Sequence, residues 1–241
     1  MALAVPAIAR ADGGDVVGGD DGTYVFQRVP INELVPTGSL TFGVGRSASK
    51  TVVFDPGYNG DLTRMKLLDR GINPNDVTDV IFTHATLGNT GGALYGGQLL
   101  FPNATHIMSA DEYNFWMNNI PDRRLVDPEN MQRAGNVQRN LVKIQPKLRL
   151  IDIDDTIEPG LLATQFVGVS PGSFGVLVAI ANGSIMWCGA LFDDNAIARI
   201  SRMSPDLYTS AGRTLLSRVK CRNTCGGINA PYYGSRLSAF A

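Results

Sequence analysis

The sequence predicts an α/β fold of four layers (αββα), in which two mixed β-sheets pack face to face and helices cover both outer faces. Short runs rich in β-branched and aromatic residues occur in both halves of the 241-residue chain, and each half continues into segments with helical spacing. The 27 glycines and 13 prolines suit the tight connections of such a fold better than they suit a helical bundle. We therefore expect one domain with a duplicated plan of strands followed by helices.

Three β-rich runs separated by Gly, Pro and Ser open the first half and predict neighbouring strands of an antiparallel or mixed sheet. They are residues 24–29, 40–44 and 51–54. A helix over 61–70 follows, because apolar residues recur there at helical spacing and Gly71 stands at a C-terminal cap position. The next predicted elements are a strand over 79–82, a helix over about 90–96, a strand over 105–108, and a helix opened by Ser109 with Asp111 and Glu112 in its first turn.

The second half begins with a polar helix over 128–143, whose first residue is a proline. Four predicted strands follow, over 148–153, 161–167, 174–180 and 185–190. Asn182-Gly183 is a strong hairpin signal between the last two strands. A last helix over about 205–219 precedes an end rich in loops.

The charge balance excludes several classes of partner. The chain carries 21 basic and 22 acidic residues, and no basic run is longer than the pair Arg123-Arg124. Nucleic acids and anionic membranes bind clustered positive charge, so we expect neither as the main partner. The apolar start of the chain is too short for a transmembrane helix, and we predict no such segment elsewhere.

Residues 1–22 are expected to form a leader or anchoring segment ahead of a domain over 23–241. The start is apolar, and Ala9-Arg10-Ala11 resembles the small-x-small pattern of an export cleavage site, although a basic beginning is missing. A signal remnant over residues 1–11 would place the protein in the thylakoid lumen, the periplasm or another exported or organellar compartment. Without such a remnant, a soluble intracellular location is expected.

The three cysteines, Cys188, Cys221 and Cys225, have no zinc-ribbon spacing. Cys221 and Cys225 are four residues apart near the expected end of a helix, and an oxidising compartment would allow them to pair. Free thiols are the simpler interpretation, and the sequence leaves both open.

Four short motifs occur in the order typical of one hydrolase family. They are Phe54-Asp55-Pro56-Gly57, the segment VTDVIFTHATLGNTGGALYGGQLLFPNATHIMSADEYNFW, Val169-Ser170-Pro171-Gly172-Ser173 and Trp187-Cys188-Gly189-Ala190. From about residue 23 to 234 the chain thereby resembles metallo-β-lactamase fold hydrolases, with closest similarity to the methyl parathion hydrolase and lactonase-like branch. The resemblance implies the αββα fold and a family chemistry in which two zinc-like ions activate a bridging water.

The ligand positions implied by this resemblance are largely degenerate. The family motif His-x-His-x-Asp-His falls on His84, Thr86, Gly88 and Asn89, the later histidine on Val169, the bridging aspartate on Gly189 and the last histidine on Gly227. Only His84 retains a metal-binding side chain. The whole chain has two histidines, and the second, His106, belongs to a different predicted strand. Because imidazole is the main donor of such a centre, we expect no metal, no other cofactor and no catalytic residue.

A mononuclear site that combines His84 with replacement ligands is the alternative. Cys188 and Asp193-Asp194 lie near the lost bridging carboxylate, but strand alternation directs Cys188 to the face opposite Gly189. Asp55 is expected to support its loop through hydrogen bonds. The expected lining of the former cleft is Asp55, His84, Asn89, Val169, Phe192 and Asp193.

Three functions follow as hypotheses. The first is a catalytically inactive member of the fold that acts as a structural or interaction subunit with other protein subunits, where Tyr232-Tyr233 is a candidate interface pair. The second is a hydrolase of esters, lactones or phosphotriesters with a rebuilt or absent metal site. The third is a module that binds a small-molecule ligand in the former cleft.

Overall fold

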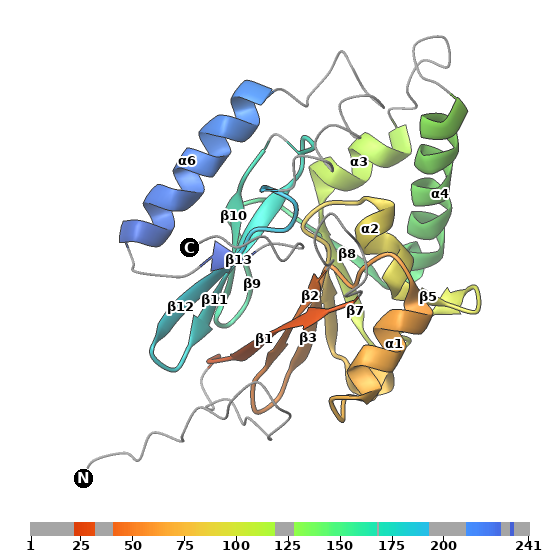
Figure 1. Cartoon of the computed structure of the whole chain (residues 1–241), viewed down its shortest axis with the longest axis horizontal. Coiled ribbons are helices and arrows are strands. Elements are labelled where there is room, and N and C mark those ends of the chain that lie inside the picture. Colours follow the sequence, from red (N-terminus) through yellow and green to blue (C-terminus); the bar gives the residue numbers. More distant parts are fainter. Residues whose placement is uncertain are drawn as a thin grey trace.

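A computed structural model of the chain describes residues 22–31, 41–118, 128–167, 169–192, 211–227 and 232–233. Two β-sheets lie face to face, with helices on both outer sides (Figure 1). This arrangement confirms the predicted four-layer αββα fold. The predicted leader over 1–22 lies almost entirely outside the described residues, and its boundary stays a prediction.

The first sheet has six strands and is mixed, as the sequence predicts. In spatial order they are β1 (Val25–Pro30), β2 (Thr41–Arg46), β3 (Thr51–Phe54), β4 (Asp79–Ile81), β7 (Thr105–Ser109) and β8 (Leu148–Ile151). The pairs from β1 to β3 are antiparallel, and those from β3 to β8 are parallel. The parallel strands end at one edge of the sheet, so the loops that follow β3 and β4 meet there.

The second sheet is formed by the second half of the chain. Its order is β13 (Tyr232–Tyr233), β12 (Gly183–Trp187), β11 (Phe174–Ile180), β10 (Leu161–Gln165) and β9 (Thr156–Glu158). All its pairs are antiparallel except β12 with β13. A separate hairpin joins β5 (Leu94–Tyr95) to β6 (Gln98–Leu99).

The first sheet is covered by helices from the first half and the middle of the chain. These are α1 (Gly60–Leu68), α2 (Leu87–Thr90), α3 (Ala110–Asn118) and α4 (Pro128–Ile144), with the 3-10 turns η1 (Pro74–Asp76), η2 (Gly91–Ala93) and η3 (Gln145–Lys147). One long helix, α6 (Ala211–Gly227), runs along the second sheet (Figure 1). Among the described residues, none of the helices combines the length and apolar character needed to cross a membrane.

Strand alternation sorts the apolar side chains into three buried layers. Val53 and Val80 pack against the helices of the first sheet. Their neighbours Val52, Phe54 and Ile81 point the other way, into the space between the two sheets. A third, smaller cluster fills the space between the second sheet and α6. The period of two along each strand therefore accounts for the layered core.

Several predicted boundaries shift in the structure. The helix predicted over 90–96 is wrong in extent: α2 and η2 cover residues 87–93, and β5 begins at 94. The predicted strand over 185–190 spans 183–187 as β12, and the hairpin turn is Ala181-Asn182 rather than Asn182-Gly183. The last helix begins by residue 211 and continues to 227, whereas residues 205–210 of the prediction lie outside the described part of the chain.

Gly91 and Gly92 allow the short helical turn after β4 to pack closely against the loop that follows β3. A Cβ on Gly91 would lie 2.2 Å from the Tyr58 carbonyl oxygen, and a Cβ on Gly92 would lie 2.1 Å from that of Pro56. Only glycine permits this approach of two backbones. The helical turn therefore docks directly on the loop that follows β3.

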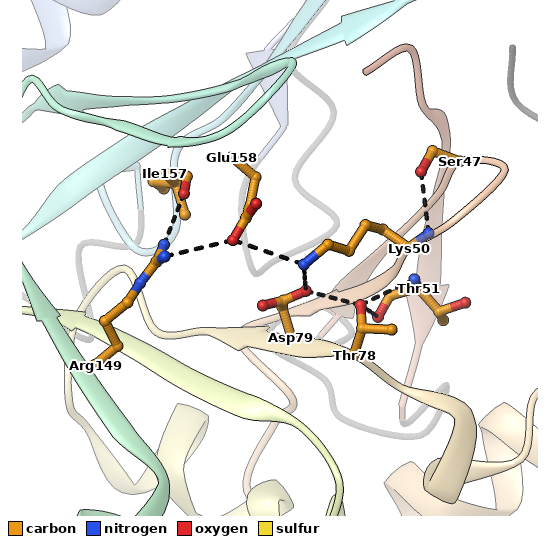
Figure 2. A network of polar contacts seen from close by, with 8 residues as sticks. All are labelled: Ser47, Lys50, Thr51, Thr78, Asp79, Arg149, Ile157 and Glu158. Atoms are coloured by element: carbon orange, nitrogen blue, oxygen red, sulfur yellow. Dashed lines mark hydrogen bonds and ion pairs between the residues drawn. The ribbon is translucent and has the colours of Figure 1, made fainter. Parts of the chain in front are cut away.

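A network of charges links the two sheets near β9 (Figure 2). Glu158 Oε1 lies 3.6 Å from Lys50 Nζ and 3.4 Å from Arg149 Nη1. Lys50 Nζ also lies 3.1 Å from Asp79 Oδ2, and Arg149 Nη2 donates to the Ile157 carbonyl at 2.7 Å. Glu158 on the second sheet therefore bridges two cations of the first sheet, Arg149 on β8 and Lys50 in the turn between β2 and β3.

We expect the substitution Glu158→Gln to cost only about 0.5–1 kcal/mol in the free energy of unfolding, because partly exposed ion pairs are weak. The side chains of Lys50 and Arg149 are 32% and 41% exposed, so water screens both pairs. Urea unfolding at low and high salt measures the effect, which should shrink with added salt. The exposed Asp155→Asn serves as control. A large loss in the free energy of unfolding that does not change with salt would contradict the interpretation of these contacts as weak, screened ion pairs.

Candidate functional site

The candidate site is built around Asp55, the residue that follows β3. Asp55 has a positive φ of 49° and is 1% exposed. Its Oδ1 accepts hydrogen bonds from the Thr83 backbone N–H at 2.9 Å and from Asn89 Nδ2 at 2.6 Å. Its Oδ2 accepts from Thr83 Oγ1 at 2.7 Å and from Trp187 Nε1 at 2.8 Å. One carboxylate thus ties together the ends of β3, β4 and β12, which agrees with the loop-supporting role expected from the sequence.

Burial disfavours the charged form of this carboxylate. It raises the pKa of Asp55 to about 6, against the opposing effect of the hydrogen bonds from Thr83, Trp187 and Asn89. In the unfolded chain the Asp55 carboxyl has a pKa near its ordinary value. Asp55 therefore binds a proton more readily in the folded protein than in the unfolded one.

This shift predicts a pH-dependent difference between wild type and Asp55→Asn, which cannot titrate. A raised pKa in the folded state contributes stability that is present at about pH 4 and is lost as the pH rises past about 6. The stability advantage of wild type over Asp55→Asn should therefore fall by about 2–3 kcal/mol between about pH 4 and pH 7. Urea unfolding of both proteins across this range measures it. A difference that grows with pH would instead indicate a depressed pKa.

His84, which the resemblance assigns to the first ligand position of the family motif, is 2% exposed. Its Nδ1 lies 3.1 Å from Thr83 Oγ1 and 3.0 Å from Asn89 Nδ2, and its Nε2 lies 3.4 Å from Thr86 Oγ1. Both ring nitrogens therefore face polar side chains of their own loop. Thr86 and Asn89, two of the degenerate positions, are part of the same hydrogen-bonded group, while Gly88 lies between them in α2.

Two positions that the resemblance assigns to later ligands, Val169 and Gly189, are tightly packed. Val169 is 2% exposed and belongs to the core cluster beneath the helices of the first sheet. Gly189 has a φ of +54°, and a Cβ there would lie 2.0 Å from Thr83 Oγ1 and 3.3 Å from Asp55 Oδ2. A side chain at position 189 would displace Thr83, so the backbone in this conformation accepts glycine alone.

A second buried carboxylate, Glu112, was missed by sequence reasoning, which assigned it only to the first turn of α3. It is fully buried, and its Oε1 accepts from the Ala85 N–H at 2.7 Å and from Trp116 Nε1 at 2.8 Å. Its Oε2 accepts from Ser170 Oγ at 2.5 Å. Burial raises the pKa of Glu112, opposed by these hydrogen bonds. The spacing of Glu112 and Trp116, one helical turn, was the available signal.

Glu112 joins the two loops that would carry histidine ligands in the family. Ala85 follows His84 in the loop after β4, and Ser170 follows Val169 in the turn before β11. Ser109 caps α3 by accepting from the Glu112 N–H at 3.1 Å, and its hydroxyl donates to the Gly172 carbonyl at 2.6 Å. The loops are thus held by protein hydrogen bonds.

The remaining predicted site residues lie elsewhere or outside the described chain. Phe192 packs beside α6, with Arg218 and Arg222 at 5.7 and 5.8 Å from its ring centre, so it belongs to the second sheet's outer cluster. Gly227 is the last residue of α6 rather than part of a loop, and Asp193 is not among the described residues. His106 is buried in β7 beside Phe82, and burial lowers its pKa to about 4.

The described donor set does not fit a binuclear metal centre. Within the ranges that the structure describes, no group of three or more His, Cys, Asp or Glu side chains is placed to hold a metal ion. Among the described residues at this edge, His84, Asp55 and Glu112 offer metal-binding atoms, but both oxygens of Asp55 accept two hydrogen bonds each and both oxygens of Glu112 also accept hydrogen bonds. Family centres of this kind need several imidazoles and a bridging carboxylate.

Comparisons with known proteins agree with this fold. Among solved structures, the dizinc quorum-quenching lactonase AidC is 21% identical with a TM-score of 0.70, covering 91% of this chain and 86% of that one. The hydrolase AbOPH of the beta lactamase superfamily is 17% identical with a TM-score of 0.67, covering 91% and 85%. A probable metal-dependent hydrolase from Staphylococcus aureus is 16% identical with a TM-score of 0.60, covering 89% of both chains.

These likenesses establish the fold, and the family follows from the sequence itself. No curated protein matches the chain. The model of the metallo-beta-lactamase superfamily matches residues 41–223, which is well over half of the 241 residues. This chain belongs to the metallo-beta-lactamase superfamily.

Proposed function

We propose that this chain acts by binding, as a structural or interaction subunit, and does not perform the metal-dependent hydrolysis associated with its fold. The observation that carries the proposal is Gly189. The family resemblance assigns this residue to the position of the bridging carboxylate, and a Cβ there would lie 2.0 Å from Thr83 Oγ1. A carboxylate between two metal ions therefore has no room, whereas Thr83 instead hydrogen-bonds Asp55.

The other ligand positions support the same proposal. Val169 packs in the apolar core, and Asn89 donates to Asp55. An empty cluster of imidazoles and carboxylates would be poorly solvated and self-repelling, so neutral, packed replacements stabilise the metal-free fold. Loss of bound metal also removes its stabilisation of the native state, and the Asp55 and Glu112 networks offset that loss.

A hydrolase of esters, lactones or phosphotriesters, with a rebuilt or absent metal site, is the second candidate. The similarity to lactonases and hydrolases favours it more directly than it favours a binding role. One specific feature adds to it: Asp55, Thr83 and His84 form a hydrogen-bonded series from carboxylate to imidazole. Such a series resembles the orientation of a general base, although His84 is 2% exposed.

Metal analysis and turnover separate the two candidates. The full chain is purified without chelators, its zinc, iron, manganese and cobalt are quantified, and an acyl homoserine lactone, an aryl ester and an aryl phosphotriester are assayed with and without added metal. The binding proposal predicts substoichiometric metal and no turnover above buffer. Stoichiometric metal, or turnover lost in His84→Asn while the melting temperature stays unchanged, would establish the hydrolase. His106→Asn, away from the site, is the matched control.

The binding role has a test of its own. In native extract, size-exclusion chromatography with detection of this chain should place most of it in an assembly larger than 25.8 kDa. Elution as a monomer at its cellular concentration would contradict an interaction subunit even if metal and turnover are absent.

A further inference from the structure

Three cysteines from distant parts of the chain meet between the second sheet and α6. Cys188 directly follows β12, and Cys221 and Cys225 lie one turn apart on α6. Their exposed fractions are 2%, 0% and 2%, and they share an apolar cluster with Phe166 and Met186. Figure 1 shows α6 lying along the second sheet, so the cluster joins these two layers.

The distances within the cluster single out one pair. Cys188 Sγ lies 3.2 Å from Cys221 Sγ, whereas Cys221 Sγ lies 4.0 Å from Cys225 Sγ. A disulfide bond has an S–S length of about 2.0 Å and needs Cβ atoms about 3.8 Å apart. Residues four apart on a helix hold their Cβ atoms about 5–6 Å apart, which a regular helix cannot reduce. The shorter sulfur–sulfur distance and the fixed spacing along the helix therefore favour Cys188 with Cys221 over Cys221 with Cys225, the pair suggested by sequence spacing.

The side chains around the cluster hold α6 against the second sheet. Arg218 Nε donates to the Leu191 carbonyl at 2.8 Å, just beyond Cys188 in the chain. Ser217 Oγ donates to the Val167 carbonyl at 2.5 Å, and Lys220 Nζ to the Gln165 carbonyl at 3.1 Å. Three hydrogen bonds from one helix face thus fix the approach of Cys221 to the end of β12.

We propose that Cys188 and Cys221 form a disulfide that crosslinks α6 to the second sheet, while Cys225 remains a free thiol. All three are free thiols in the structure, so the crosslink is an oxidative modification of this pair. This disulfide proposal does not depend on whether the protein is an interaction subunit or a hydrolase.

Cys221 is the attacking thiol. A hydrogen bond from Cys188 lowers the pKa of Cys221, while burial raises the pKa of Cys188 and raises that of Cys225 to about 12. The Cys221 thiolate attacks one sulfur of a low-molecular-weight disulfide such as oxidised glutathione and expels one thiolate. Cys188 then loses its proton, attacks Cys221 Sγ and expels the second thiolate. The protein loses two electrons and two protons, and the reagent is reduced to two thiols.

Burial controls the rate of this reaction. Because the cluster is inaccessible, the reagent reaches Cys221 only when α6 opens away from the sheet or before it docks. Mild denaturant should therefore accelerate crosslinking. Since Cys188 directly follows Trp187, which donates to Asp55, the crosslink also anchors the strand end that makes this hydrogen bond.

Mass spectrometry tests the pairing directly. The full chain is incubated with oxidised glutathione in mild denaturant, unfolded, alkylated and digested with trypsin. Cleavage after Lys220 and Arg222 places Cys221 and Cys225 on different peptides. We expect one alkylated cysteine, Cys225, and a dipeptide containing Cys221 attached to the peptide of Cys188.

Matched variants and thermal unfolding complete the test. Cys225→Ser should crosslink like wild type, and neither Cys188→Ser nor Cys188→Ala should crosslink. The bond closes a loop between residues 33 apart, so oxidised wild type should melt on the order of 10 °C above the reduced form. Three alkylated cysteines after oxidation, or a bond between Cys221 and Cys225, would overturn the proposal. The wild-type digest decides it even if a variant does not fold.

Discussion

Introducing the family's bridging carboxylate by Gly189→Asp is expected to lower the free energy of unfolding by about 5 kcal/mol. The backbone has a φ of +54°, which strains any side chain, and the new Cβ would overlap Thr83 Oγ1. The added carboxylate would also be buried within reach of Asp55 Oδ2, where two like charges disfavour one another. Denaturant unfolding, read as a shift in midpoint at constant slope, measures the loss.

Gly71 supplies the matched control for this substitution. It has a φ of +67°, and a Cβ there would meet nothing within 4 Å. Gly71→Asp should therefore cost only about 1–2 kcal/mol, the strain of the left-handed backbone alone. If both variants lose the same stability, position 189 has room for a side chain and the main support for a binding role disappears. Stoichiometric zinc uptake by Gly189→Asp, with a raised melting temperature, would favour the hydrolase.

Removal of the second buried carboxylate by Glu112→Ala should cost about 3–5 kcal/mol. The substitution leaves the Ala85 N–H, Trp116 Nε1 and Ser170 Oγ without their acceptor in a buried setting. It also separates the loop after β4 from the turn before β11, so both should lose protection from amide exchange. Denaturant unfolding gives the free energy, and hydrogen exchange locates the loss.

Two further variants separate hydrogen bonding from charge and from helix propensity. Glu112→Gln keeps one carbonyl acceptor and the side-chain volume, so it should lose about 1–2 kcal/mol. The neighbouring exposed Asp111→Ala alters only the first turn of α3 and should cost about 0.3–1 kcal/mol. If Glu112→Ala resembles Asp111→Ala, the buried network does not support the loops as argued.

Much of the architecture could be predicted because its signals are local. The run Thr51–Phe54 is a strand whose side chains alternate between two clusters, and Phe174–Ile180 begins and ends where the pattern predicts. Alternation also correctly directed Cys188 away from the site, into the cluster beside α6. The helix predicted over 90–96 failed because Gly91 and Gly92 serve a contact with the loop after β3, and no local pattern reveals such a contact.

The sequence by itself determined that the chain has two histidines, fewer than the several imidazoles that a binuclear family centre uses. Only the tertiary structure decided which side chains meet at the candidate site and beside α6. Trp187 donates to Asp55 across 132 residues, Ser170 to Glu112 across 58, and Cys188 meets Cys221 across 33. Periodicity and propensity report the neighbours of a residue along its own element, whereas these contacts arise where separate elements end at one place.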